Sequence, residues 1–269
     1  MPMKHCLISG HRDSEVIYML ANNPDTSAQF GSLGNDVHVP ATFRYELLDF
    51  IAGELPRWRD HPDRQSNTSE TVLTSQLCAH LNSVARHSAG WDVLQFKVEE
   101  PDEKQKGRKI DLVASPSGTA VWIEGRRHTI FDTLMPIECK RLPTPKGEGR
   151  DKREYVINRH SSTGGIQRFK AGHHGSGHAL GAMIGYVQET TATVWNRRVA
   201  GWIKGLIRTA QPGWSVKDLL RFEQRDATSR LTVLHSSHER QNSLSDIELR
   251  HLWLEMNCAP SAVMSIKQK

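Results

Sequence analysis

The feature that most limits the fold of this chain is a run of short apolar segments that follows one amphipathic helix. Residues 69–86 place apolar side chains at helical spacing, from Val72 and Leu73 to Val84. Four strand-like segments then follow in direct succession, at 91–101, 108–115, 119–125 and 134–142, separated by charged or Ser-, Pro- and Gly-containing turns. One helix followed by consecutive strands predicts an α/β fold.

The segments on either side of this run extend the prediction. Residues 41–58 form an amphipathic helix that we expect to end at Pro56, and residues 190–210 form a basic amphipathic helix terminated by Pro212 and Gly213. Residues 229–240 read as a late strand, and residues 243–256 as a final helix capped at Ser243 or Ser245. We expect one α/β domain over 61–269, preceded by a partly helical extension over 1–60 whose role is open.

Composition narrows the function classes. The chain has 269 residues and a net charge of +5, and its four cysteines are scattered without a CxxC pair. This cysteine pattern fits a reducing compartment. No apolar run is long enough to span a membrane, so we expect a cytoplasmic protein with no membrane partner. Residues 146–170 carry seven basic and three acidic side chains, and a second basic cluster covers 104–109. Such clusters suit a polyanionic partner.

The residues that most suggest chemistry lie in two of the expected strands. Glu138 and Lys140 are two positions apart and therefore point to the same face, while Cys139 points to the other. Asp111 lies in an earlier strand, and Glu70 lies in the first turn of the preceding helix. If the two strands are neighbours, Asp111 and Glu138 form a site of hard oxygen ligands, to which the main-chain carbonyl of Cys139 could add. Such a site suits Mg²⁺ or Mn²⁺.

Asp111 followed by Glu138-Cys139-Lys140, with Glu70 on the preceding helix, resembles the PD-(D/E)xK motif of restriction-endonuclease-like nucleases. The resemblance covers roughly residues 69–190. It implies a central mixed β-sheet flanked by helices, with a restriction-endonuclease-like core. It also implies that Asp111 and Glu138 hold the metal, that Lys140 is the catalytic lysine and that Glu70 is the helix acid.

One spacing departs from a simple hairpin. Glu138 follows Asp111 by 27 positions, so an extra strand or loop must fit between them, and residues 119–133 would be that insertion. The insertion also offers a rival to the Glu-x-Lys motif, Glu124-Gly125-Arg126, which lies closer to Asp111. Arginine rarely replaces the lysine because a guanidinium does not readily give up its proton, so we favour Glu138 and Lys140.

Residues downstream of the lysine are candidates for substrate contact. In nucleases of this type, Gln, Tyr or Arg side chains often follow the lysine strand, which here suggests Tyr155, Gln167, Arg168 and Lys170. The resemblance implies a Mg²⁺- or Mn²⁺-dependent deoxyribonuclease of restriction or antiviral defence, with DNA as partner and RNA not excluded. A helicase or ATPase would be a separate subunit, because this chain has no GxxxxGK[ST] motif, and a homodimer is possible.

Three alternatives stay open. A catalytically silent subunit with the same fold would bind nucleic acid or act as a scaffold. A zinc site could use His173, His174 and His178, although Gly175 and Gly177 disfavour a shared helical face there. An RNA-cleaving effector on the same fold is the third alternative. The serines and histidines of residues 235–238 read as a core strand that ends in a polar loop, because no GxSxG nucleophile elbow accompanies them.

Overall fold

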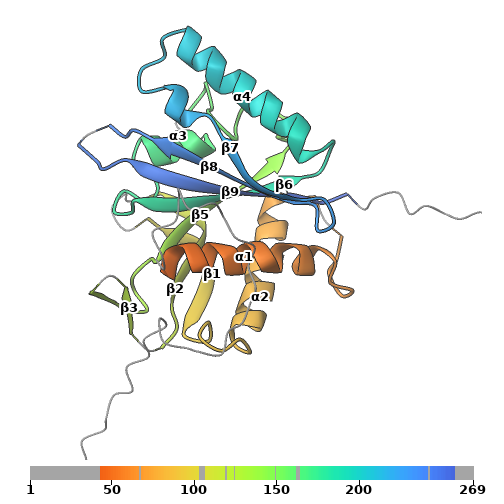
Figure 1. Ribbon diagram of the computed structural model, residues 1–269, viewed down its shortest axis with the longest axis vertical. Coiled ribbons are helices and arrows are strands. Elements are labelled where there is room, and N and C mark those ends of the chain that lie inside the picture. Colours follow the sequence, from red (N-terminus) through yellow and green to blue (C-terminus); the bar gives the residue numbers. More distant parts are fainter. Residues whose placement is uncertain are drawn as a thin grey trace, which may run out of the picture.

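The computed structural model shows a seven-stranded sheet with helices on both faces (Figure 1). It describes residues 43–66, 68–102, 107–118, 120–123, 125–148, 150–161, 164–241 and 243–257. The α/β class expected from the sequence is confirmed. No helix in these ranges is long and apolar enough to cross a membrane.

The sheet is mixed, as the sequence led us to expect. Strands β1, β2 and β5 form an antiparallel meander, β5, β6 and β9 run parallel, and β8 and β7 complete the sheet as antiparallel neighbours. The spatial order is β1-β2-β5-β6-β9-β8-β7. The strands are β1 (Leu94–Pro101), β2 (Lys109–Pro116), β5 (Met135–Leu142), β6 (Leu180–Val187), β7 (Arg221–Asp226), β8 (Leu231–His238) and β9 (Ile247–Glu255).

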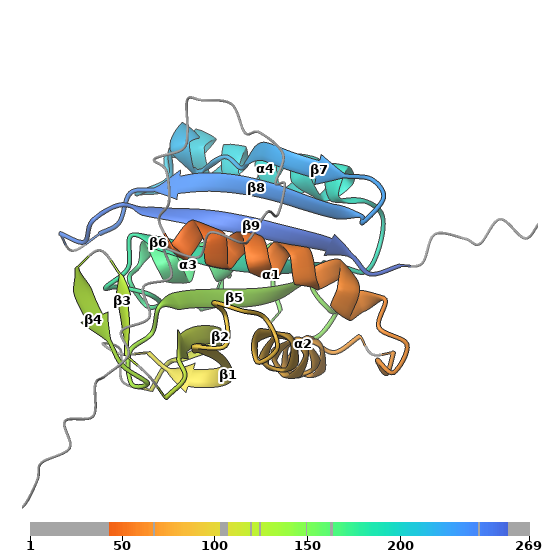
Figure 2. The same cartoon turned by 60° about the horizontal axis from the view of Figure 1, so that its bottom comes forward.

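The expected insertion between the two motif strands is a separate hairpin. Strands β3 (Val121–Ile123) and β4 (Arg126–His128) pair only with each other and stand beside the main sheet (Figure 2). This hairpin accounts for the long interval between Asp111 and Glu138 and leaves β2 and β5 free to pair directly. Residue Glu124 of the rival motif lies outside the described residues.

Two helices cover each face of the sheet (Figure 2). Helices α1 (Phe43–Arg59) and α2 (Glu70–Ala85) pack on one face, and α3 (Gly165–Lys170) and α4 (Ala192–Arg208) pack on the other. Each face has its own apolar core, and α1 contributes Leu47, Leu48 and Ile51 to the core that α2 also joins. The described part of residues 1–60 is therefore packed into the domain core.

Two expectations about elements were wrong, while the helix expected over 190–210 is confirmed as α4. Helix α1 continues through Pro56 to Arg59. Residues 243–256 do not form a helix, because most of them build strand β9. This strand lies between β6 and β8 and is buried on both faces, so it carries apolar residues on both sides. Its apolar residues do not alternate regularly with polar ones, and such a pattern can be mistaken for a helix at sequence level.

Candidate active site

The four motif residues meet where β2 and β5 separate. The β2–β5 ladder pairs Leu112–Ala114 with Met135–Ile137, and Asp111 and Glu138 are the next residues beyond it. The main-chain amide of Cys139 donates a hydrogen bond to Asp111 Oδ2 at 2.9 Å. At this point the Cys139 amide bonds to the Asp111 side chain instead of to a main-chain carbonyl of β2. The Asp111 carboxylate is thereby held against β5.

Glu70 joins the site from the first turn of α2. One of its oxygens, Oε2, accepts a hydrogen bond from the Arg141 amide at 3.0 Å, which ties the helix start to β5. Its other oxygen, Oε1, accepts from Lys140 Nζ at 3.0 Å. A carboxylate is also favoured at this position by the positive end of the helix dipole.

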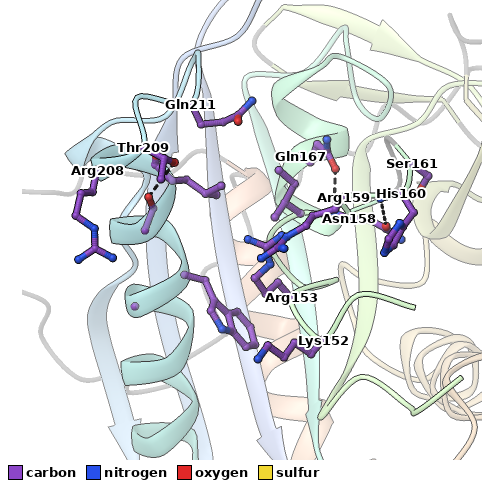
Figure 3. A pocket seen from close by; sticks show the side chains of 15 residues that line it. Lys152, Arg153, Asn158, Arg159, His160, Ser161, Gln167, Arg208, Thr209 and Gln211 are labelled. Atoms are coloured by element: carbon purple, nitrogen blue, oxygen red, sulfur yellow. Dashed lines mark hydrogen bonds between the residues drawn. The ribbon is translucent and has the colours of Figure 1, made fainter. Parts of the chain in front are cut away.

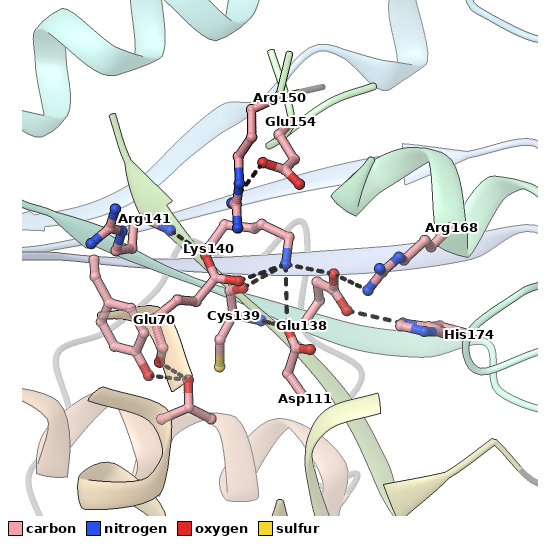
Figure 4. A network of polar contacts seen from close by, with 12 residues as sticks. Glu70, Asp111, Glu138, Cys139, Lys140, Arg141, Arg150, Glu154, Arg168 and His174 are labelled. Carbon is pink, nitrogen blue, oxygen red and sulfur yellow. Dashed lines mark hydrogen bonds and ion pairs between the residues drawn. The ribbon is translucent and has the colours of Figure 1, made fainter. Parts of the chain in front are cut away.

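Lys140 stands at the centre of the site (Figure 4). Its side chain is almost fully buried, and its ammonium lies among oxygens from three secondary-structure elements. The contacts of Nζ are Glu138 Oε1 at 2.9 Å, the Cys139 carbonyl at 2.9 Å, Glu70 Oε1 at 3.0 Å and Asp111 Oδ2 at 3.3 Å. We call Glu70, Asp111, Glu138 and Lys140 the carboxylate–lysine cluster. The structure thus brings together all four residues that the sequence assigned to catalysis.

Glu138 is fully buried and has two further cationic or polar neighbours. Arg168, from α3, donates to Glu138 Oε1 at 2.7 Å. His174 places Nδ1 3.0 Å from Glu138 Oε2, but the two buried atoms are not aligned for a hydrogen bond. Arg168 therefore anchors Glu138 to α3. It is the one sequence candidate for substrate contact that lies at the cluster.

The contribution of His174 was missed by sequence reasoning, which considered it only as a zinc ligand. Its position depends on Gly175, which has a φ of 60° and on which a Cβ would lie 2.8 Å from Pro136. Only glycine adopts this conformation without strain. The glycine-rich sequence around it was the available signal, because it marks a turn that brings the chain close to β5.

The charges of the cluster are unbalanced. Burial and the charge of Glu138 raise the pKa of Asp111 to about 6, although the attraction of Lys140 opposes them. Burial also acts to raise the pKa of Glu138, but Lys140, His174 and Arg168 outweigh it and lower that pKa. Burial acts to lower the pKa of Lys140, and the three carboxylates raise it well above its ordinary value. Three carboxylates face one ammonium and one guanidinium, so the site is short of positive charge.

This charge state changes the role open to Lys140. An ammonium whose pKa is raised well above its ordinary value does not give up its proton near neutral pH. In this arrangement Lys140 donates hydrogen bonds and can stabilise negative charge.

The oxygen ligands fit Mg²⁺ or Mn²⁺ in kind. Within the described residues, no group of three or more His, Cys, Asp or Glu side chains is arranged to hold a metal ion. Asp111, Glu138 and the Cys139 carbonyl provide two carboxylates and one main-chain oxygen, and Mg²⁺ commonly keeps several waters beside so few protein ligands. A cavity of about 140 Å³ beside Glu70, Asp111 and Glu99 has room for such waters.

The other three substrate-contact candidates lie elsewhere. Gln167 uses Oε1 to accept hydrogen bonds from the amides of Asn158 and Gly164, and its side chain lines a separate cavity. Tyr155 is 1% exposed, so its hydroxyl is in the core and not at a surface. Lys170 is also buried, and its ammonium contacts Asp218 Oδ1 at 2.5 Å.

Tyr155 and Lys170 belong to one buried chain of hydrogen bonds, whose ends are Trp253 and Lys170. We call it the buried polar chain, and it crosses β9 and β8 to reach the short helix Val216–Asp218. Its successive members are Trp253, Tyr155, His251, Ser236, His238, Asp218 and Lys170, with heavy-atom distances of 2.7, 2.8, 2.7, 2.7, 2.5 and 2.5 Å.

The direction of every hydrogen bond in this chain follows from the charged Asp218 carboxylate and the two neutral histidines. Burial lowers the pKa of His238 and lowers that of His251 well below its ordinary value, so both are neutral near pH 7. The Asp218 carboxylate accepts from His238 Nδ1, so His238 Nε2 accepts from Ser236. Ser236 then accepts from His251 Nε2, and His251 Nδ1 accepts from Tyr155. Each donor thus meets an acceptor along the whole chain.

Ser236, His238 and Asp218 also have the contacts of a hydrolase triad. Ser236 Oγ lies 2.7 Å from His238 Nε2, and Asp218 lies 2.5 Å from His238 Nδ1. However, Ser236 is only 2% exposed and is held by His251 as well, so no substrate can reach its oxygen. The arrangement does not support serine hydrolase chemistry.

Comparisons with known proteins add no family to this geometry. No family model, no curated protein and no solved structure matches the chain.

Proposed function

We propose that this protein is a metal-dependent nuclease that hydrolyses phosphodiester bonds in DNA. The observation that carries the proposal is the convergence of Glu70, Asp111 and Glu138 on Lys140 from a helix and two strands. The order α2-β1-β2-β5-α3-β6, with an antiparallel meander next to a parallel strand, agrees with the restriction-endonuclease-like core that the motif suggests.

The residues would divide the work in a definite way. Lys140, positively charged and central, would donate hydrogen bonds to the phosphoryl group and stabilise the negative charge that develops during hydrolysis. Glu70 would hold Lys140 in place while fixing the start of α2 to β5. Arg168 would fix the orientation of Glu138 and lies close enough to contact a phosphate.

The metal would be Mg²⁺ or Mn²⁺, held by Asp111, Glu138 and the main-chain carbonyl of Cys139. When bound, such an ion polarises a phosphoryl oxygen and lowers the pKa of an attacking water. The unbalanced charge of the cluster supports this assignment, because a divalent cation would relieve the repulsion that raises the pKa of Asp111. Lys140 also contacts the same oxygens, so its ammonium would shift when the ion binds.

The test is cleavage of supercoiled plasmid and of single-stranded DNA by the purified protein with Mg²⁺, Mn²⁺ or EDTA. We expect cleavage that needs the metal and that is lost in Glu138→Ala and Lys140→Ala. Lys217→Ala is the matched control, because it removes one ammonium from an exposed pair with Glu239 and should leave the rate unchanged. Parallel RNA substrates establish whether the enzyme prefers DNA.

A binding or scaffolding role would give a different pattern. In that case the protein would bind nucleic acid equally well with and without metal, and the substitutions in the cluster would change neither binding nor the substrate. That result would refute the nuclease proposal. Roles in restriction or antiviral defence, beside a separate helicase or ATPase, belong to the proposal and follow only if cleavage is observed.

A further inference from the structure

A large open cavity lies on the face of the sheet that α3 and α4 cover, apart from the carboxylate–lysine cluster (Figure 3). It has a volume of about 940 Å³ and lies between α4, α3 and residues 152–161. This volume is at the upper end of the range of about 300–1,000 Å³ that is usual for ligand sites. We call it the α4 cavity.

The charge of the α4 cavity is strongly positive. The cations that line it are Lys152, Arg153, Arg159 and Arg208, with His160 beside them, and none of the described residues that line it is acidic. Asp151 lies behind the wall and forms a two-bond pair with Arg153, at 2.9 and 3.2 Å. Lys152, Arg159 and Arg208 are exposed. Arg159 Nε also lies 3.9 Å from Asp151 Oδ2, so Lys152 and Arg208 are the cations most available to an anionic ligand.

The cavity also offers an aromatic surface. Trp202 lines it and packs its ring against Trp195, with the two ring centroids 6.2 Å apart. Next to Trp202, Gly201 and Gly205 leave the α4 backbone bare, and a Cβ at either position would meet nothing within 4 Å. Cations beside an aromatic ring are the combination that binds unpaired nucleotides, because the ring stacks on a base and the cations contact phosphates.

Two connections link the cavity to the carboxylate–lysine cluster. Gln167 lines the cavity and precedes Arg168, which contacts Glu138, so one turn of α3 faces both sites. The segment that supplies Lys152, Arg153 and Arg159 also contains Arg150, which stands above Lys140 in Figure 4 and pairs with Glu154. A strand of nucleic acid could therefore extend from one site to the other along basic side chains.

We propose that the α4 cavity binds a single-stranded segment of the nucleic acid whose backbone is cut at the carboxylate–lysine cluster. The cavity is bounded by α4 and residues 152–161, and an aromatic ring beside cations suits unpaired bases better than paired ones. Trp202 would stack on a base, and Arg159, Arg208 and Lys152 would contact the phosphates. This inference rests on the proposed function for its substrate, but the cavity can be tested without any cleavage.

The test is fluorescence anisotropy in EDTA with a labelled oligothymidylate of about 15 nucleotides and a duplex of equal length. Gly205→Phe fills the cavity from a position where an added Cβ meets nothing within 4 Å. It also removes a helix glycine, so it should not unfold the protein. We expect it to weaken single-strand binding at least tenfold and duplex binding less than threefold. The double variant Arg159→Ala/Arg208→Ala should give the same loss with a weaker salt dependence.

Gly53→Phe is the matched control. Gly53 lies on α1, where a Cβ also meets nothing within 4 Å, and it is far from the α4 cavity in the fold. It should leave oligonucleotide binding unchanged. If Gly205→Phe binds the oligonucleotide as tightly as the unsubstituted protein does, the proposal is wrong. If a free mononucleotide binds in the cavity but does not compete with the oligonucleotide, the ligand is a free nucleotide and the proposal is also wrong.

The binding assay separates this inference from the nuclease proposal. If Lys140→Ala and the unsubstituted protein both fail to cut DNA while Gly205→Phe still abolishes single-strand binding, the nuclease fails and the α4 cavity stands. If cleavage occurs but binding is insensitive to Gly205→Phe, the nuclease stands and the α4 cavity fails.

Discussion

The carboxylate–lysine cluster and the buried polar chain are built from the same kinds of side chains on the same sheet, yet they differ in charge and access. In the cluster, three carboxylates share one ammonium and one guanidinium, and Asp111 and Glu70 keep 28% and 29% of their side chains exposed. In the buried polar chain, one carboxylate meets one ammonium, and every donor has an acceptor. Polar residues alone therefore do not mark a functional site. The carboxylate–lysine cluster, the candidate site, differs from the buried polar chain by an unbalanced charge that solvent can reach.

The largest expected effect is a loss of stability when a substitution interrupts the buried polar chain. Asp218→Ala leaves Lys170 and His238 buried without their carboxylate, so we expect a loss of about 3–5 kcal/mol in the free energy of unfolding. Urea denaturation measures it. Glu239→Ala removes the carboxylate of an exposed pair and should cost less than about 1 kcal/mol. An equal loss in the two variants would show that the chain contributes nothing special.

The next effect compares the two central lysines. Lys140→Arg keeps the charge but places a planar guanidinium among four oxygens that surround a compact ammonium, so we expect cleavage to fall about 100-fold or more. Lys170→Arg makes the same exchange in the buried polar chain. It should lower stability and leave the cleavage rate of the folded enzyme within threefold. Similar losses of rate in both variants would contradict the division between the two regions.

The third effect is a pH dependence that belongs to the buried polar chain. His238 and His251 have lowered pKa values in the folded protein, so the unfolded chain binds more protons below about pH 6.5. Their contribution to stability is present above that pH and is lost as the pH falls. Between about pH 7.5 and 5.5 each of these histidines lowers the free energy of unfolding by at most about 1.4 kcal/mol, and the raised pKa of Asp111 offsets part of the loss.

His251→Gln tests this assignment, because His251 has the more strongly lowered pKa and the drop should become less than half as large. The exposed His87 provides the matched variant, His87→Gln, in which the drop should be unchanged. A slope that is the same in all three proteins would assign the proton uptake to other groups.

The smallest effect tests the unbalanced charge of the carboxylate–lysine cluster. The pKa of Asp111 is raised from 3.8 to about 6, so its charged form is disfavoured in the folded protein. In EDTA at about pH 8, Asp111→Asn should therefore raise the free energy of unfolding by about 1–2 kcal/mol while cleavage with metal is lost. At about pH 4 the gain should vanish, because Asp111 is then protonated in the folded state. A variant that is less stable at both pH values would contradict the charge imbalance.

The sequence predicted the cluster better than it predicted the surroundings. Glu138, Lys140 and Asp111 follow from strand periodicity and a short motif, because both are local properties of the chain. The pairing of β5 with β6 and of β6 with β9 is not local, so nothing in the sequence placed Tyr155 against His251 or Lys170 against Asp218. The sequence suggested both residues as substrate contacts that follow the strand of Lys140, but tertiary packing placed them in the core.

The wrong assignment of residues 243–256 has the same origin. A strand between two others is buried on both faces, so its apolar pattern loses the alternation that identifies a strand. Strand β1, at the edge of the sheet, keeps exposed and buried positions mixed, and its sequence was interpreted correctly. The difference between the two strands lies in their position in the sheet.

The shortness of the β2–β5 ladder has a consequence for how such a site can be lost. Only three residue pairs join these strands before they part, and the amide of Cys139 bonds the Asp111 side chain instead of continuing the ladder. Extending the pairing by two residues would cost little, because one hydrogen bond would replace another of similar strength. The same extension would pair β2 with β5 at the positions where Asp111 and Glu138 now approach Lys140. The site is thus a fork in the sheet, and small changes that favour regular pairing would close it without harming the fold.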